Sequence, residues 1–424
     1  MRDIVVTLPD LHSGQAAAYL KPGRFKAIRA GRRWGKTLLG TTILANGAAN
    51  GQTVGYFAPA YKYISETFQE ILEVLEPVKR SSSETKGIIR TRSKGRVDFW
   101  TLEDDRAGRS RKYHTVVIDE AAFTKPNMLA IWERNIRPTL LDYGGNAYVL
   151  SNTNGMDPEN FFWQICNEPR FGFTEFHAPT HTNPHLPPEE LAKLEAENHP
   201  LVFRQEYLAE FVDWAGTAFF AEDSFLFNSQ PVPPPAWCDS VFAVIDTATK
   251  TGKQHDGTAV TFYAYASQPQ RCLYVVDWEA IQIEGALLET WLPTVFARLE
   301  ELAKTLRARR GSLGAWVEDR STGQVLLQHA ARRGWPAQAI DTKLTAIGKD
   351  ERAVLVSGYV HQRLVQITVE AYRKTTTYKG TTRNHWLSQV LGFRIGQKDT
   401  GREDDLFDTF TYGTALTFGN NQGL

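Results

Sequence analysis

The chain has 424 residues, of which 42% are hydrophobic and 23% are charged. This length suits at least two hydrophobic cores, and this composition excludes a disordered, collagenous or fibrous protein. Lysine plus arginine and aspartate plus glutamate each number 48, so any attraction to nucleic acid has to come from local patches and not from the net charge.

The first ten residues, MRDIVVTLPD, place an acid and a proline before the core of a signal peptide could form. No apolar run reaches the roughly 18 residues of a membrane-spanning helix, so we expect neither a membrane-spanning nor a secreted protein. Cys166, Cys238 and Cys272 are far apart and form no C-x-x-C pair. They indicate reduced thiols in a cytoplasm.

Apolar runs in the first half alternate with segments of helical pattern. These runs are FKAIRA, TVGYFAPA, RVDFWTL, HTVVIDEAA and NAYVLSNT. The alternation predicts an α/β domain with a mostly parallel sheet and crossover helices. From residue 187 to about 219 the pattern is helical and predicts a small helical appendage.

The run PVPPP at 231–235 suits neither a helix nor a central strand and predicts an extended connector. Beyond it, VFAVID, TAVTFYAY and RCLYVVDWEAI predict three consecutive strands, followed by a long helix from about 284 to 310, the strand GAWVE and a final helix near EDDLFDTFTYGTAL. We therefore expect a first domain over 1–229 with its helical part over about 180–229, a connector over 230–236 and a second domain over 237–424.

A phosphate-binding loop is predicted at AGRRWGKT, residues 30–37, between a strand and a helix-forming segment. In such a loop the backbone amides wrap the phosphates, Lys36 neutralises the β and γ oxygens, and the Thr37 hydroxyl binds Mg²⁺. Ala30 replaces the first glycine of the pattern, which is tolerated where φ is negative. We expect ATP and its Mg²⁺ against Gly31, Arg33, Gly35, Lys36 and Thr37.

Four residues are considered for the chemistry at the γ-phosphate and its Mg²⁺. Arg32, or Arg33 beside it, would stabilise the charge on the transferring group. The run HTVVIDEAA places Asp119 and Glu120 at the end of a strand. Asp119 would hold Mg²⁺ through water, and Glu120 would orient and deprotonate the attacking water.

Two further segments are assigned to this nucleotide site. YVLSNTNG at 148–155 ends a strand with small polar side chains, Ser151 and Asn152 among them, which can sense the γ-phosphate. A polar turn is the alternative. The amide of Gln15 matches the edge of adenine, with an ordinary surface glutamine as the alternative.

A second site is predicted from acids at strand ends and at a helix start: Asp246, Asp256, Glu318, Asp319, Asp404, Asp405 and Asp408. Carboxylates without His or Cys partners suit Mg²⁺ or Mn²⁺. Two such ions would activate a water and stabilise the leaving oxygen in phosphodiester cleavage. The order of elements is that of a ribonuclease H-like fold. Acids that merely complement helix dipoles are the alternative.

Together these motifs resemble the large terminase subunit of tailed double-stranded DNA bacteriophages. The resemblance covers nearly the full chain and is carried by GRRWGKT, VVIDEAAF, VLSNTNG, FRQEYLAEF, AVIDTATKTGKQHDGTAV, VEDRSTGQVLLQ, GKDERA and EDDLFDTF. It implies an ATPase of the additional-strand catalytic-glutamate class joined to a ribonuclease H-like endonuclease. Such proteins cut concatemeric DNA and translocate it into a procapsid.

The resemblance also implies roles for single residues. In the ATPase they are Lys36 and Thr37 in Walker A, Asp119 and Glu120 in Walker B, Ser151 to Asn154 as coupling motif, and Arg32 as the loop arginine. Arg109 lies where many members have an Arg-Gly pair, although Ser110 replaces that glycine. In the nuclease the implied acids are Asp246, either Glu318 or Asp319, and Asp404.

The implied cofactors are ATP with Mg²⁺, and two Mg²⁺ or Mn²⁺ ions at the nuclease site. The implied partners are double-stranded DNA, the small terminase subunit and the portal protein, with a pentameric ring as the packaging form in the host bacterial cytoplasm. Basic clusters at 106–112 and 307–310 could contact DNA phosphates or merely keep a surface soluble.

Two other functions fit the same residues. One is a helicase-like ATPase that remodels DNA and whose second domain carries no chemistry. The other is a non-enzymatic, ATP-gated DNA clamp in which the acids of the second half are only surface charge.

Overall fold

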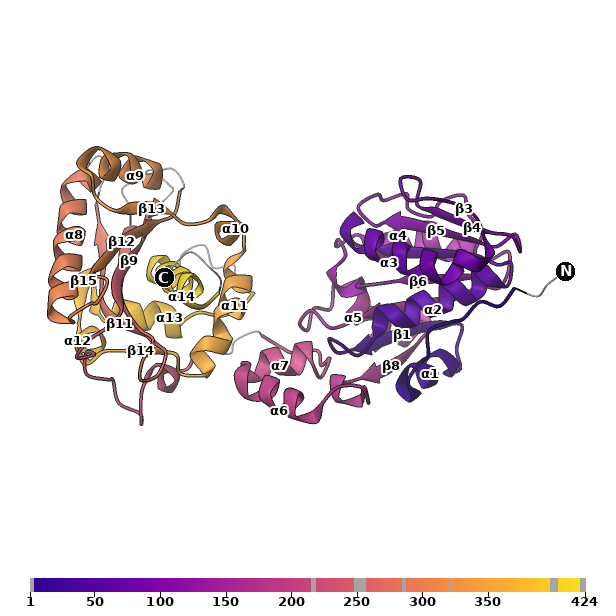
Figure 1. The fold of residues 1–424 in the computed structure, drawn as a ribbon, viewed down its shortest axis with the longest axis horizontal. Helices are drawn as coiled ribbons and strands as arrows, with labels where there is room; N and C mark the ends of the chain where they lie inside the picture. The colour runs from indigo at the N-terminus through magenta and orange to yellow at the C-terminus, as the bar shows by residue number, and fades with distance from the viewer. Residues whose placement is uncertain are drawn as a thin grey trace. The chain divides into compact units, whose positions relative to one another are not determined.

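The computed structural model describes residues 4–214, 219–247, 257–283, 287–319, 322–396 and 403–419 (Figure 1). The chain divides into two compact units, one made of Met1–Glu195 and Pro200–Asp213, the other of Ala196–His199 and Trp214–Leu424. The proline-rich run belongs to the second unit, where the Val232 N–H donates to the Ile367 carbonyl at 3.1 Å.

The first unit contains an eight-stranded sheet in the order β3-β4-β5-β2-β6-β7-β1-β8. The pairs β3-β4 and β4-β5 are antiparallel, and the other neighbours are parallel. The mostly parallel α/β fold predicted for the first half is therefore confirmed. The strands are β1 Phe25–Ala30, β2 Thr53–Ala58, β3 Lys79–Ser83, β4 Ile88–Thr91, β5 Arg96–Thr101, β6 Thr115–Ile118, β7 Asn146–Ser151 and β8 Phe173–Ala178.

Both faces of this sheet are buried. Successive strand residues point to opposite sides, and helices cover each side. Val117 of β6 packs with the side chains of α2 and α3, whereas Val116 and Ile118 pack with those of α4 and α5. This double burial explains why the strands are continuous apolar runs in the sequence. The helices are α1 Ser13–Leu20, α2 Lys36–Ala49, α3 Tyr61–Leu75, α4 Met128–Ile131, α5 Phe161–Asn167, α6 Pro188–Glu197 and α7 Pro200–Glu206.

The predicted continuation of the helix beyond residue 206 is wrong, since α7 ends at Glu206. The carbonyls of Glu206 and Tyr207 accept hydrogen bonds from the N–H groups of Arg32 at 2.8 Å and Thr180 at 2.7 Å. These tertiary partners replace the helical ones, and Ala209 takes a positive φ of 52°.

The second unit contains a six-stranded mixed sheet in the order β13-β12-β9-β10-β11-β14. β9, β10 and β11 are antiparallel, and the other neighbours are parallel. This is the strand, hairpin, strand order predicted for the second half. The strands are β9 Ser240–Thr247, β10 Gly257–Ala266, β11 Cys272–Gln282, β12 Ser312–Val317, β13 Ala337–Ala339, β14 Val365–Ile367 and the hairpin β15 Thr376–Tyr378 with β16 Thr381–Arg383.

Helices cover both faces of the second sheet, with α8 and α9 on one side and α11, α13 and α14 on the other (Figure 1). The helices are α8 Leu288–Thr305, α9 Thr322–Arg333, α10 Thr342–Thr345, α11 Lys349–His361, α12 Val369–Arg373, α13 His385–Leu391 and α14 Asp405–Phe418. Among the described residues, no helix combines the length and apolarity needed to cross a membrane.

Helix α14 is buried along most of its length and packs closely on β10. Gly413 makes this approach possible, because a Cβ at that position would lie 2.5 Å from the ring of Tyr263. The Tyr263 hydroxyl also donates to the Thr409 carbonyl at 3.0 Å. The helix that carries the last acids of the chain is thus fixed against the central strands.

Candidate active sites

The loop at 30–37 joins the end of β1 to the start of α2 in the first unit. Ala30 lies in the strand, so the position where the pattern has glycine needs no special backbone angle. Gly35 has a φ of 99°, which a side chain would strain. Lys36 is buried, and its Nζ donates to the carbonyls of Ala30 at 3.1 Å and Gly31 at 3.2 Å. The loop therefore curls around its own lysine, as a phosphate-binding loop does.

The two acids after β6 face this loop. Asp119 is buried, and its Oδ2 accepts from the Thr37 hydroxyl and from the Tyr56 hydroxyl, both at 3.2 Å. A hydroxyl and a carboxylate side by side are oxygen donors of the kind that Mg²⁺ prefers. The predicted pair Thr37 and Asp119 therefore fits a magnesium ion.

Glu120 has a left-handed backbone with a φ of 50°. Its N–H donates to Asp119 Oδ1 at 3.0 Å. Burial raises the pKa of Glu120, and the charge of Lys36 opposes the rise. Burial lowers the pKa of Lys36, and Glu120 and Asp119 oppose that fall. A carboxylate with a raised pKa beside a phosphate site is suited to accept a proton from water.

Arg32 and Asn152 both contact Glu206, which was not among the predicted site residues. Glu206 Oε2 accepts from Arg32 Nε at 2.5 Å and from Asn152 Nδ2 at 3.0 Å. The Arg33 side chain is exposed, and its carbonyl accepts from Asn183 Nδ2 at 2.8 Å. Arg32 is exposed as well, but its guanidinium pairs with Glu206.

The segment after β7 connects the acids of the first unit to α7. The Ser151 hydroxyl accepts from the Ala122 N–H at 3.1 Å. The Thr153 hydroxyl donates to the carbonyls of Gln205 at 3.2 Å and Glu210 at 2.7 Å. The segment is therefore more than a polar turn at a strand end, because it forms hydrogen bonds both to Ala122, which follows the two acids, and to residues at and beyond the end of α7.

Gln15 does not present a free amide for adenine. It is 1% exposed, its Nε2 donates to the Gly35 carbonyl at 2.8 Å, and its Oε1 accepts from the His12 N–H at 2.9 Å. Its neighbours instead give it a structural role in holding the phosphate loop. The alternative of a surface glutamine also fails, because the side chain is buried.

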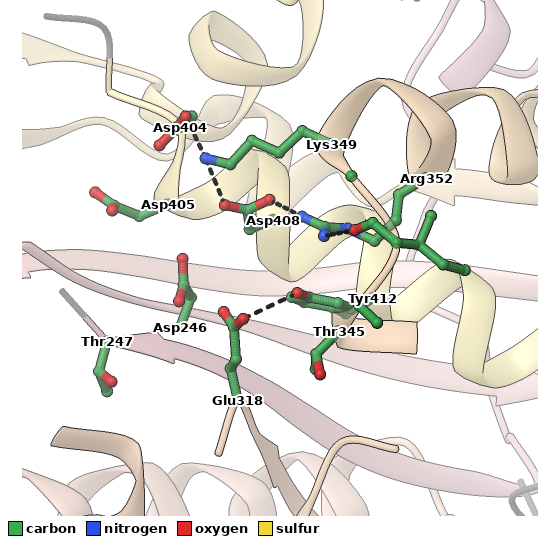
Figure 2. A pocket seen from close by; sticks show the side chains of 13 residues that line it. Asp246, Thr247, Glu318, Thr345, Lys349, Arg352, Asp404, Asp405, Asp408 and Tyr412 are labelled. Atoms are coloured by element: carbon green, nitrogen blue, oxygen red, sulfur yellow. Dashed lines mark hydrogen bonds and ion pairs between the residues drawn. The ribbon is translucent and has the colours of Figure 1, made fainter. Parts of the chain in front are cut away.

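A cavity of about 390 Å³ opens in the second unit where β9, β12, α11 and α14 meet (Figure 2). Asp246 comes from β9, Glu318 follows β12, and the remaining acids come from the start of α14. The side chains shown around the cavity are those of Asp246, Thr247, Glu318, Thr345, Lys349, Arg352, Asp404, Asp405, Asp408 and Tyr412.

Two cations from α11 reach into this acidic cavity. Lys349 Nζ pairs with Asp404 and with Asp408 Oδ2, the latter at 2.8 Å, and Arg352 pairs with the other oxygen of Asp408 (Figure 2). Arg352 is 4% exposed, so its ion pair with Asp408 is buried. The two cations thus pair with Asp404 and with the buried Asp408.

The other acids of the cavity lining are Asp246, Glu318 and Asp405. The Tyr412 hydroxyl donates to Glu318 Oε1 at 3.2 Å, and the Tyr378 hydroxyl donates to Asp405 Oδ2 at 3.2 Å. Burial raises the pKa of Asp246 well above its usual range, and the negative charges of Asp408, Asp405 and Glu318 raise it further. A cation placed among these acids would relieve that repulsion.

The donor set fits a hard divalent ion by its chemistry, because the cavity lining offers carboxylate oxygens and neither imidazole nor thiolate. As the side chains stand, no three His, Cys, Asp or Glu residues in the described part of the chain converge on one metal position. Ion binding would therefore require the acids to move closer to one another.

The predicted acids of the second unit fall into two groups, those that line the cavity and those that do not. Asp246, Glu318, Asp404 and Asp405 line the cavity, whereas Asp319 is exposed and is absent from the lining. Of the pair left open by the sequence, the geometry favours Glu318. Asp404 pairs with Lys349, whereas the acids whose charges act most on Asp246 are Asp408, Asp405 and Glu318, so Asp405 fits the site better than Asp404. Asp256 lies outside the described residues.

Comparison with solved structures shows the fold. No protein-family model and no curated protein matches the sequence. The structure is similar to the large terminase of a thermophilic bacteriophage in its second crystal form, with 11% identity, 96% of this chain and 99% of that chain covered, and a TM-score of 0.62. The chain has the fold of a bacteriophage large terminase. The same phage terminase in complex with ATP-γ-S gives 12% identity, the same coverage of 96% and 99%, and a TM-score of 0.59.

Several residues of this terminase fold were missed as site residues. Glu206, Lys349, Arg352 and the two tyrosines belong to the sites but not to the predicted sets. A signal existed for Lys349 and Arg352, because residues three apart share one face of a helix and both lie in the run GKDERA. The contacts of Tyr378 and Tyr412 depend on tertiary packing, and the sequence carries no sign of them.

Proposed function

We propose that this chain is an ATP-driven motor that packages double-stranded viral DNA and cuts it with its own metal-dependent endonuclease. The proposal is carried by one observation: a single chain with the terminase fold holds a phosphate loop with two facing acids in one unit and an acidic cavity in the other. The large terminase of the thermophilic phage was solved with ATP-γ-S and with ADP, which supports nucleotide binding here.

In the first unit the triphosphate would enter the loop that now surrounds Lys36. The ammonium group would exchange its two carbonyl partners for the β and γ oxygens. Glu120, whose burial raises its pKa, would orient the attacking water and take its proton. Arg32 would stabilise the charge that develops on the γ-phosphate. Bound Mg²⁺, held by Thr37 and Asp119, would neutralise charge on the β and γ oxygens.

In the second unit Asp246, Glu318 and Asp405 would hold the divalent ions. Two bound Mg²⁺ or Mn²⁺ ions would make water nucleophilic at neutral pH and stabilise the leaving oxygen. Tyr412 and Tyr378 orient two of these carboxylates through their hydroxyl groups. Lys349 offers positive charge to a DNA phosphate at the mouth of the cavity.

The biological setting follows from this proposal. The substrate is concatemeric double-stranded DNA, and the partners are a small terminase subunit and the portal of a procapsid. Packaging would use a pentameric ring of this chain in the host bacterial cytoplasm, docked transiently on the procapsid.

Two substitutions test whether the chain has two separate activities. Glu120→Ala should abolish ATP turnover and leave Mn²⁺-dependent plasmid nicking intact, because the acidic cavity is unchanged. Asp246→Ala should do the reverse. Turnover and nicking are measured on the full chain, with circular dichroism as the control for folding. Loss of both activities in either folded variant contradicts the proposal.

The helicase-like alternative is less well supported. A helicase of that kind needs a second lobe with a parallel sheet to complete its nucleotide site. Here the second unit has the antiparallel strands β9, β10 and β11 at the centre of a mixed sheet.

A further inference from the structure

Three basic side chains are buried in the part of the chain that the structure describes: Lys26, Lys36 and Arg352. Asp119 and other acids oppose the fall that burial causes in the pKa of Lys36, and Arg352 pairs with Asp408. Lys26 differs, because burial alone lowers its pKa and no carboxylate of the described residues pairs with it. A buried ammonium group without a carboxylate costs stability, which is tolerated where a ligand uses the charge.

Lys26 lies near the start of β1, at the amino-terminal edge of the parallel strands. Its Nζ donates to the Tyr19 carbonyl at 2.6 Å and to the Tyr148 hydroxyl at 3.3 Å. Both tyrosines line a cavity of about 270 Å³, together with residues from the last turns of α2 and the starts of β6 and β7. The phosphate loop precedes the other end of α2, which is about 20 Å long. The cavity is therefore separate from the nucleotide site.

The hydroxyl of Tyr148 is set up to donate a hydrogen bond. Its oxygen accepts from Lys26, and its own proton has no acceptor among the described residues. Lys26 Nζ also lies 4.6 Å from the centre of the Tyr148 ring. A hydroxyl that accepts from an ammonium group becomes a stronger donor, because hydrogen bonds in a chain polarise one another. The charge of Lys26 therefore acts on the cavity through this hydroxyl.

Two further residues of the lining have the same polarity. His114 Nδ1 accepts from the Thr53 N–H at 3.3 Å, so the neutral ring carries its proton on Nε2. Asn46 Oδ1 accepts from Asn50 Nδ2 at 3.0 Å, which leaves the Asn46 amide its N–H donors. At all three residues the protein uses an acceptor atom and leaves a donor. No Asp or Glu is among the described residues of the lining, so the cavity suits an anion.

The single positive charge suits a carboxylate better than a phosphate. Phosphate sites use several positive charges or the N-terminus of a helix, as loop 30–37 does. Here the nearby helix end is the C-terminus of α2, where Asn50 is the capping residue. The partial negative charge of a helix C-terminus opposes the larger charge of a phosphate.

The rim of the cavity suits contact with another protein. Tyr143, which lines the cavity, and Leu141, two residues before it, are 51% and 69% exposed. The Tyr143 ring stacks on that of His114, with ring centres 3.8 Å apart. Exposed aromatic and aliphatic side chains beside a polar site are typical of surfaces that bind proteins.

We propose that this cavity binds the carboxylate of an acidic side chain from a partner protein. Tyr148, polarised by Lys26, and the N–H groups of His114 and Asn46 would donate to the carboxylate oxygens. Tyr143 and Leu141 would pack against the residues that flank the acid. The inference does not rest on the proposed function, because none of these residues belongs to the nucleotide site or to the acidic cavity.

The test uses the full chain and two peptide probes, acetyl-GGEGG-amide and acetyl-GGQGG-amide, which differ by one charge. Saturation-transfer NMR without nucleotide measures their binding. We expect the acidic peptide to bind at least about ten-fold more tightly than the neutral one, because a hydrogen bond to a charged group contributes that much. Lys26→Met should abolish this preference. Tyr148→Phe, which removes only a hydroxyl, should weaken the acidic peptide about five-fold.

Lys21→Met is the matched control. It removes the same charge a few residues away, where Lys21 Nζ lies 5.6 Å from the centre of the Phe176 ring, and Lys21 is not among the described residues of the lining. The preference for the acidic peptide should persist in this variant. Urea denaturation gives a second readout. Lys26→Met should not lower the midpoint, because an apolar side chain of similar size replaces a buried charge.

Several outcomes would overturn the inference. Equal binding of the two peptides by the folded wild type, or binding of neither, shows that the cavity does not recognise a carboxylate. A lower urea midpoint in Lys26→Met with an unchanged preference makes the lysine structural. Inorganic phosphate is the third probe. If it binds more tightly than the acidic peptide, and Lys26→Met removes that binding, the ligand is a phosphate group, such as that of a nucleic acid, and not a protein carboxylate.

Discussion

The two candidate sites both balance buried acids against cations, but they assemble these groups in different ways. In the first unit Lys36 and Arg32 come from one loop of eight residues, 30–37, and Asp119 and Glu120 follow one strand, β6. In the second unit the acids come from β9, the end of β12 and α14, and the cations from α11. A phosphate site can thus be built largely from local chain geometry, whereas the acidic cavity exists only after the whole unit has folded.

The two sites also differ in how closely their cations lie to their acids. The acids of the first unit lie beside Lys36, which lowers the pKa of both Asp119 and Glu120 against the effect of burial. In the second unit the two cations of α11 pair with Asp404 and Asp408, and Asp246 faces other acids. The acidic cavity is therefore under more electrostatic strain before any ion binds.

The largest expected effect separates the two adjacent acids after β12. Glu318→Gln should reduce Mn²⁺-dependent nicking by at least about 100-fold, because it removes a charged oxygen donor from the cavity lining. Asp319→Asn should change it by less than about two-fold, because Asp319 is exposed and outside the cavity lining. Plasmid relaxation measures both. Equal losses would place both acids in the site.

A smaller effect tests the cations of α11. Arg352→Met should lower the free energy of unfolding by about 3 kcal/mol, because it leaves the buried Asp408 without its guanidinium partner. Urea denaturation followed by tryptophan fluorescence measures this. The pair Arg352→Met with Asp408→Leu should recover most of the loss, since neither buried charge of the pair then remains. Additive losses would show that packing of the arginine, rather than its charge, is what matters.

Gln15→Ala tests the structural role of that amide. We expect a loss of about 1–2 kcal/mol in the free energy of unfolding, because the Gly35 carbonyl and the His12 N–H lose their partner. The ratio of ATP to GTP turnover should stay the same. A change in that ratio without a loss of stability would instead support contact with the base.

The smallest effect concerns pH. Burial and neighbouring acids raise the pKa of Asp246 in the folded chain, so the folded state holds this proton more tightly than the unfolded one. The resulting stabilisation is present below the ordinary aspartate pKa and is lost as the pH rises through the raised value. In EDTA, Asp246→Asn should therefore be roughly 1 kcal/mol more stable than the wild type at about pH 8 and equal to it near pH ~4. A difference that does not vary with pH would contradict this account.

Much of the fold was predictable because buried strands leave unbroken apolar runs. Those runs also located Asp119, Asp246 and Glu318, since each acid lies at or just after the end of one. The end of α7 was not predictable, because the carbonyls at and just after its end bond to Arg32 and Thr180 from distant parts of the chain. The pairing of Lys349 with α14 and the burial of Gln15 depend on packing in the same way.

Gly413 has no functional group of its own, yet α14 depends on it to lie against Tyr263. A single added methyl group would push the helix away from β10 and carry Asp405 and Asp408 with it. Gly413→Ala should therefore disturb the acidic cavity without changing any of its carboxylates. The close contact between Gly413 and Tyr263 thus matters to the cavity as much as the side chains that line it.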